Sequence, residues 1–132
     1  MEITVTQEQG RVPVTILHVK GDVNTTTADE FQAQAQKAYD DGARDMLIDL
    51  SEVALLSSAG LRALHSIFNM LRSELPEESD EVIRKGLNDG TFKSPHLKLL
   101  NPTQNVSQVL RMAGFDMFLE VYDNHKKAVA SF

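Results

Sequence analysis

Two adjacent hydroxyl side chains, those of Ser57 and Ser58, are the residues of this sequence best placed to do chemistry. They follow an apolar run that ends at Asp49-Leu50, and a helical pattern begins directly after them. A serine at the start of a helix can accept a hydrogen bond from a first-turn N–H group, which contributes about 1 kcal/mol. We expect Ser58 to be this cap, with Gly60 and Leu61 supplying the N–H groups. A cap accounts for one serine, but not for a glycine inside the first turn.

A catalytic role for Ser58 would need a base and an acid, and His65 and Asp49 supply those residue types. Ser58 and His65 are separated by about 10 Å of helical rise, so a direct hydrogen bond is not expected. The G-x-S-x-G nucleophile elbow and the glycine-rich phosphate loops are missing from the sequence. No metal-ligand spacing joins the four histidines, which are His18, His65, His96 and His125. We therefore expect no enzyme, no cofactor and no metal site, and interpret His18 as a hydrogen-bonded structural residue.

Composition narrows the class of protein further. A chain of 132 residues is about one domain long. Its formal net charge of −6 argues against binding to nucleic acid or to an anionic membrane, because both repel an acidic protein. The lack of cysteine excludes a disulfide scaffold and a thiolate site. No apolar run reaches the roughly 18 to 20 residues of a membrane span, and no signal-peptide pattern opens the sequence, so we expect a cytoplasmic protein.

The elements that must position the two serines follow from the spacing of apolar residues. Strands are expected at Glu2–Thr6, Val12–Val19, Met46–Leu50, Leu97–Leu100 and Phe118–Tyr122. Helices are expected from a capping box at Thr27–Glu30 to Gly42, along Leu61–Leu71, along Val106–Ala113, and after a cap at Asp123. The first strand joins the second by a hairpin, and the alternation of later strands with helices implies right-handed crossovers. The predicted fold class is α/β, with a mostly parallel sheet.

Residues 74–96 differ in character from the rest of the chain. They combine acidic residues with two glycines and two prolines and contain few large apolar side chains. Such a composition cannot bury much core. The sequence therefore predicts a single domain over residues 1–132 that carries a mobile acidic insertion at 74–96.

Four stretches resemble the STAS domain of bacterial anti-sigma factor antagonists. They read GDVNTTTADEF, DMLIDLSEVALLSSAGLRAL, LKLLNPTQNVSQVLRMAGF and DNHKKAVASF, and they cover nearly the whole chain outside residues 74–96. The resemblance implies a STAS-like fold with a mostly parallel sheet and helices packed mainly on one side. It also implies partner switching, in which the antagonist binds an anti-sigma factor that is also a serine kinase and is released when that kinase phosphorylates it.

The resemblance also implies roles for particular residues. Aligned on Gly60-Leu61, the phosphorylated serine of the family falls on Ser58, with Ser57 as the alternative. A phosphate is tolerated there because first-turn N–H groups and the helix dipole favour an anion, whereas its charge alters the surface that a partner must fit. The implied partner-binding residues are Asp22, Asn24, Thr25, Thr26, Ser57, Ser58, Ala59, Gly60 and Leu61.

Three positions differ from the family pattern and leave an alternative open. Ser57 and Asn24 stand where the pattern has acids, and Ala59 stands where it has a second hydroxyl residue. The alternative is a STAS scaffold or small-ligand sensor that is not phosphorylated. The implied partners are an anti-sigma factor serine kinase and a PP2C-type phosphatase, and the protein itself is expected to be a monomer or a weak homodimer.

Overall fold

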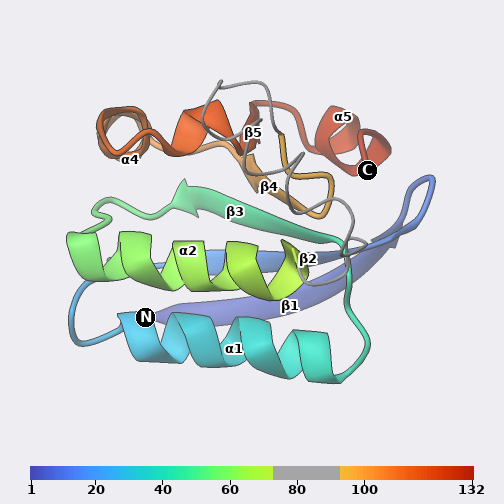
Figure 1. Ribbon diagram of the computed structural model, residues 1–132, viewed down its shortest axis with the longest axis horizontal. Coiled ribbons are helices and arrows are strands. Elements are labelled where there is room, and N and C mark those ends of the chain that lie inside the picture. Colours follow the sequence, from blue (N-terminus) through green and yellow to red (C-terminus); the bar gives the residue numbers. More distant parts are fainter. Residues whose placement is uncertain (73–92) are drawn as a thin grey trace.

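The computed structural model describes residues 1–72 and 93–132, which form one five-stranded sheet in the order β1-β2-β3-β4-β5. The strands are β1 Glu2–Gln9, β2 Pro13–Lys20, β3 Met46–Glu52, β4 Leu97–Leu100 and β5 Glu120–Tyr122. β1 pairs with β2 in an antiparallel hairpin, and the other neighbours are parallel (Figure 1). The predicted α/β class and the initial hairpin are thereby confirmed.

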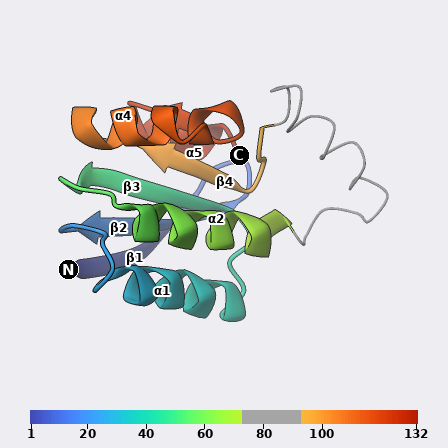
Figure 2. The ribbon, with the colours of Figure 1, turned by 60° about the vertical axis from the view of Figure 1, so that its left-hand side comes forward.

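Helices cover the two faces of this sheet unequally (Figure 2). They are α1 Ala28–Asp40, α2 Ser58–Arg72, α4 Gln104–Met112 and α5 His125–Ala130, with a 3-10 turn η2 at Phe115–Met117. Buried residues of α1, α2 and α4 belong to one apolar cluster, and those of α5 belong to another on the opposite side. None of the helices within the described ranges is long and apolar enough to cross a membrane.

The main core lies between the sheet and helices α1, α2 and α4. Phe31 and Phe68 from the helices pack into the same cluster as Leu17, Ile48 and Leu99 from the three central strands. Burying a side chain of this size stabilises the fold by roughly 1.5–3 kcal/mol. On the other face, which we call the back face, a smaller cluster forms under α5. β2 and β3 are apolar on both faces along much of their length because both faces are covered.

Two of the predicted helix caps are wrong. Thr27 precedes α1, but its hydroxyl makes no hydrogen bond to the helix. Thr27 Oγ1 instead accepts from the Asn24 N–H at 3.0 Å and donates to the Asp22 carbonyl at 2.8 Å. At the last helix the cap is Asn124, whose side-chain oxygen accepts from the Lys127 N–H at 3.0 Å. At α1 the capping box is right about where the helix begins and wrong about the bond that Thr27 makes, whereas at α5 the predicted cap, Asp123, lies one residue before the observed one.

The predicted insertion at 74–96 lies largely outside the described residues. Its last residues are described and are tied to the body of the domain. Ser94 is buried, and its N–H donates to the Phe118 carbonyl at 2.8 Å. His96 Nδ1 lies 2.9 Å from Asp45 Oδ1 at the amino end of β4. This end of the segment thus belongs to the packed structure.

Candidate functional site

The loops that follow β2 and β3 lie side by side at the carboxyl ends of these strands. The Val23 N–H donates to the Leu55 carbonyl at 2.9 Å, and the Ser57 N–H donates to the Val23 carbonyl at 2.9 Å. A parallel bridge between Val23 and Leu56 continues the pairing beyond the sheet. The predicted site residues of the first loop therefore lie beside the start of α2 (Figure 1).

The loop after β2 is held in shape by its own side chains. Asn24 Oδ1 accepts a hydrogen bond from the Thr26 N–H at 2.9 Å, which closes an Asx turn. Thr27 binds both Asn24 and Asp22, as described above. This leaves Asp22, Thr25 and Thr26 exposed and Asn24 half-buried. The loop offers a fixed polar surface that includes one carboxylate.

The two serines have different roles, and the expected cap is corrected by one residue. Ser57 Oγ accepts a hydrogen bond from the Gly60 N–H at 3.3 Å, so Ser57, not Ser58, caps α2. Ser58 is the first residue of the helix and is exposed. Within the described residues, its hydroxyl has no hydrogen-bond partner. The Ser58 hydroxyl is therefore available to another molecule without loss of the cap.

Gly60 serves the packing of the domain itself. It is buried, and a Cβ atom at this position would lie 2.6 Å from Leu56 Cδ1, 2.9 Å from the Val23 carbonyl oxygen and 3.0 Å from Val23 Cγ1. The glycine inside the first turn of α2 is therefore explained by close packing against Val23 and Leu56 of the same chain. Ala59 is also buried and Leu61 is half-buried. Among the implied partner-binding residues from Ser57 to Leu61, Ser58 is the exposed one.

The residue types of a serine hydrolase are present but are not brought together. His65 is exposed, and its ring contacts those of Phe68, Phe115 and Phe118 at centroid distances of 6.0, 6.3 and 6.5 Å. Asp49 is bound to His18 on the back face, with 2.9 Å between Asp49 Oδ2 and His18 Nδ1. Neither group is in a position to activate Ser58.

His18 and Asp49 form part of a hydrogen-bonded chain across three strands. Thr6 Oγ1 lies 2.9 Å from His18 Nε2, and Asp49 Oδ1 accepts from the Ser51 N–H at 3.0 Å and hydroxyl at 2.7 Å. Burial raises the pKa of Asp49, but the hydrogen bonds from Ser51 and His18 outweigh it and hold the pKa below its usual value. The interpretation of His18 as a hydrogen-bonded structural residue is confirmed.

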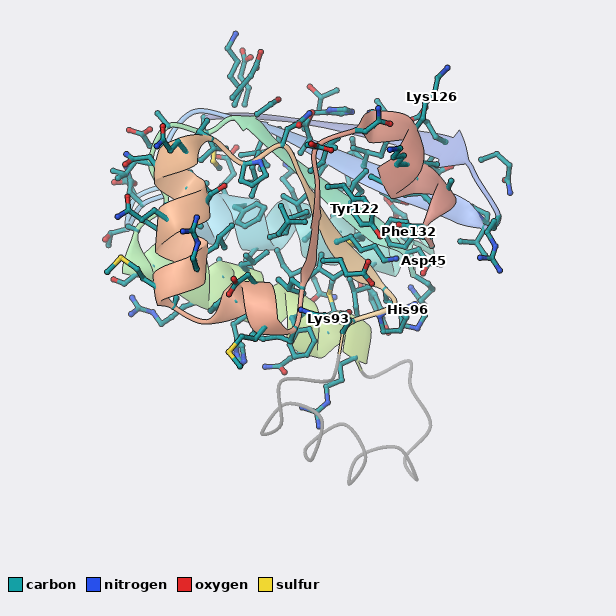
Figure 3. The ribbon with its side chains drawn as sticks, turned by 90° about the horizontal axis from the view of Figure 1, so that it is seen from above. Asp45, Lys93, His96, Tyr122, Lys126 and Phe132 are labelled. Atoms are coloured by element: carbon teal, nitrogen blue, oxygen red, sulfur yellow. The ribbon has the colours of Figure 1, made fainter. Side chains whose placement is uncertain are left out.

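A second polar cluster lies on the back face, under the C-terminal residues. The buried Lys98 Nζ donates to the Ser131 carbonyl at 2.8 Å and hydroxyl at 3.0 Å. It lies 4.9 Å from the Phe132 ring centroid and 5.8 Å from that of Tyr122, two side chains that are neighbours in Figure 3. Burial lowers the pKa of Lys98, and the nearby carboxylates of Glu120 and Asp45 oppose this effect. The cluster links β4 to the C-terminal residues that follow α5.

An open groove runs along α2, beginning one turn beyond the serines. It has a volume of about 430 Å³ and is lined by Leu61, Arg62, His65, Ser66 and Phe115. Of these residues, only Leu61 is among the implied partner-binding residues, and His65 was considered only as a candidate base. One wall of the groove is formed by α2, and the spacing of its residues can be read from the sequence. The other wall is Phe115 of η2, which only the fold brings next to α2. Leu55 is 45% exposed and places an apolar side chain on the surface two residues before Ser57, the cap of α2.

Comparison with known families agrees with this architecture of a mostly parallel sheet and paired loops. The family model of the STAS domain matches residues 4–75, which include both loops and α2. This match spans more than half of the chain, and the protein belongs to the STAS domain family. No curated protein matches the sequence.

Solved structures show the same fold at low sequence identity. A candidate anti-sigma factor antagonist of Thermotoga maritima is 20% identical, with a TM-score of 0.72 over 96% of this chain and 90% of that one. An anti-sigma factor antagonist of Mycobacterium paratuberculosis is 19% identical, with a TM-score of 0.68 over 98% and 93%. SpoIIAA of Bacillus in its phosphorylated form is 13% identical, with a TM-score of 0.59 over 96% of both chains.

Proposed function

We propose that this protein is an anti-sigma factor antagonist that binds an anti-sigma factor serine kinase and is released when Ser58 is phosphorylated. The observation that carries the proposal is the state of Ser58, which is exposed, takes no part in the cap, and lies at the start of α2 beside the loop of Asp22 to Thr26. The solved structures described as anti-sigma factor antagonists share this fold and support the same function.

The chemistry of the switch is a phosphoryl transfer. The kinase moves the γ-phosphoryl group of ATP to Ser58 Oγ, the hydroxyl loses its proton, and ADP leaves. The product carries about −1.5 to −2 additional charge at a position where the side chain had been uncharged. Because Ser57 holds the cap, the phosphate removes no hydrogen bond from the fold. Affinity for the partner is thus lost while the domain stays folded.

Two of the three departures from the family pattern, Ser57 and Asn24, have structural roles in this chain. Ser57, in place of an acid, caps α2, and Asn24, in place of an acid, closes the Asx turn in the neighbouring loop. Because these two positions hold neutral residues where the family pattern has acids, the surroundings of Ser58 carry two fewer negative charges. This favours a phosphate there electrostatically and leaves Asp22 as the acidic group of that loop.

The test uses Ser58 variants with the candidate anti-sigma serine kinase of the source organism. After incubation with ATP, intact mass should show one added phosphate on the parent and none on Ser58→Ala. Ser58→Ala should retain affinity, whereas Ser58→Glu should fold and bind at least tenfold more weakly, since the added charge must be desolvated at the interface.

Ser57→Ala serves as the matched control and should lose about 1 kcal/mol of stability through the cap while still being phosphorylated. A parent that binds the kinase but gains no phosphate would favour a STAS scaffold without a switch. Tight binding by Ser58→Glu would show that the switch lies elsewhere.

A further inference from the structure

Arg62 is a cation placed one helical turn beyond Ser58. On a helix, residues four apart lie on the same face, with their Cβ atoms about 5–6 Å apart. Arg62 is exposed, and the first turn of α2 contains no acidic residue. Among the described residues, no carboxylate pairs with its guanidinium. Arg62 is therefore free to reach toward the side chain of Ser58.

The hydrogen bonds at the start of α2 leave room for this contact. The Gly60 N–H is taken by Ser57 Oγ, and the Leu61 N–H donates to the Ser57 carbonyl at 2.9 Å. A group on Ser58 Oγ therefore does not find these two donors free. Arg62 also lines the groove that opens along α2, so its side chain has space to move.

We infer that Arg62 is the partner, within the chain, of a phosphate on Ser58. The guanidinium presents several N–H donors and pairs well with phosphate oxygens, which makes it suited to this contact. The inference rests on the proposed function and specifies its regulation. Phosphorylation then changes two features of the surface that binds the partner. It adds a charged group at Ser58, and it engages Arg62, the cation that lines the groove, in an ion pair with that group.

The second pKa of the phosphate reports the contact directly. A neighbouring cation favours the dianion and lowers this pKa. Other titratable groups on adjoining segments are Asp22 after β2, Glu52 at the end of β3 and His65 on α2. These groups, together with the helix dipole, are the same in the parent and in a variant of Arg62. The difference between the two proteins therefore isolates Arg62.

The experiment uses the full chain with phosphoserine encoded at position 58 and follows its phosphate by phosphorus NMR during a pH titration. Arg62→Gln should raise the second pKa by about 0.15–0.4, the size that i, i+4 ion pairs on helices imply. Arg62→Lys should restore part of the shift, and Arg111→Gln, which removes an exposed arginine from α4, should change nothing. The difference should shrink in 1 M salt, where the Debye length is about 3 Å.

A second measurement needs no variant of Arg62. In the parent, the guanidinium Nε–H resonance of Arg62 should shift and exchange more slowly in the phosphorylated chain than in the unmodified one. Equal second pKa values in the parent and Arg62→Gln, or an unmoved Arg62 resonance, would overturn the inference. Because the phosphate is encoded, that failure is independent of whether a kinase modifies Ser58, which the preceding experiment decides.

Discussion

At the scale of the residue, the absence of a side chain at Gly60 determines how α2 meets the preceding loops. An added methyl group would meet the carbonyl oxygen of Val23 at 2.9 Å, a backbone atom that cannot rotate away. We expect Gly60→Ala to lose roughly 1–3 kcal/mol of unfolding free energy, the usual cost of overpacking, as measured by urea denaturation. Ser58→Ala in the same turn is the control and should change stability by less than about 0.5 kcal/mol. An alanine variant as stable as the parent would show that the loop relaxes freely.

At the scale of the element, the hydrogen-bonded chain on the back face joins the first three strands through Thr6, His18, Asp49 and Ser51. The pKa of Asp49 is lowered in the folded state, so its carboxylate stabilises the fold above its unfolded pKa of about 3.9, and this contribution is lost as the pH falls through the folded value. Ser51→Ala should therefore lose about 1 kcal/mol at pH 7.

This loss should become smaller as the pH is lowered below about 4, because a protonated Asp49 no longer depends on the Ser51 hydroxyl. Urea unfolding at several pH values measures it. Ser66→Ala, which removes a half-buried hydroxyl from α2, should show no such trend. A cost for Ser51→Ala that is the same at every pH would mean that Ser51 acts through the loop backbone and not through the carboxylate.

At the scale of the whole molecule, the chain closes its back face with α5 and the C-terminal residues over Lys98. The Lys98 side chain is buried, and burial lowers the pKa of its amine, so keeping the amine charged has a cost in free energy. Lys98→Met should keep the packing and change stability by at most about 1 kcal/mol. Lys98→Ala should lose about 2–4 kcal/mol because it leaves a cavity.

Thermal and urea unfolding of the two variants measures the difference. Glu120 accepts a 2.5 Å hydrogen bond from the Tyr122 hydroxyl, which neither variant removes, and both variants lose the same amine, so their difference reports on packing of the side chain. If Lys98→Met were as unstable as Lys98→Ala, the charged contacts to Ser131 would be the main attachment of the C-terminal residues.

Local patterns in the sequence were sufficient to predict the order of the elements and the class of fold. The apolar run at β3 and the 3.6-residue stripe of α2 depend only on neighbouring residues. Parallel strands joined by helices must direct their carboxyl ends to one edge of the sheet. Chain order alone therefore places Ser58 near the loop that runs from Asp22 to Thr26.

Only the tertiary structure decided which partner each polar or small residue takes. A shift of one residue in the start of α2 transfers the cap from Ser58 to Ser57, and periodicity does not locate a helix end that finely. Thr27 binds its own loop, Gly60 packs on Val23, and Asp49 binds His18 from another strand. These contacts join residues distant in sequence or compete with equally good local bonds, so they are determined by the register of the sheet and the packing of the loops.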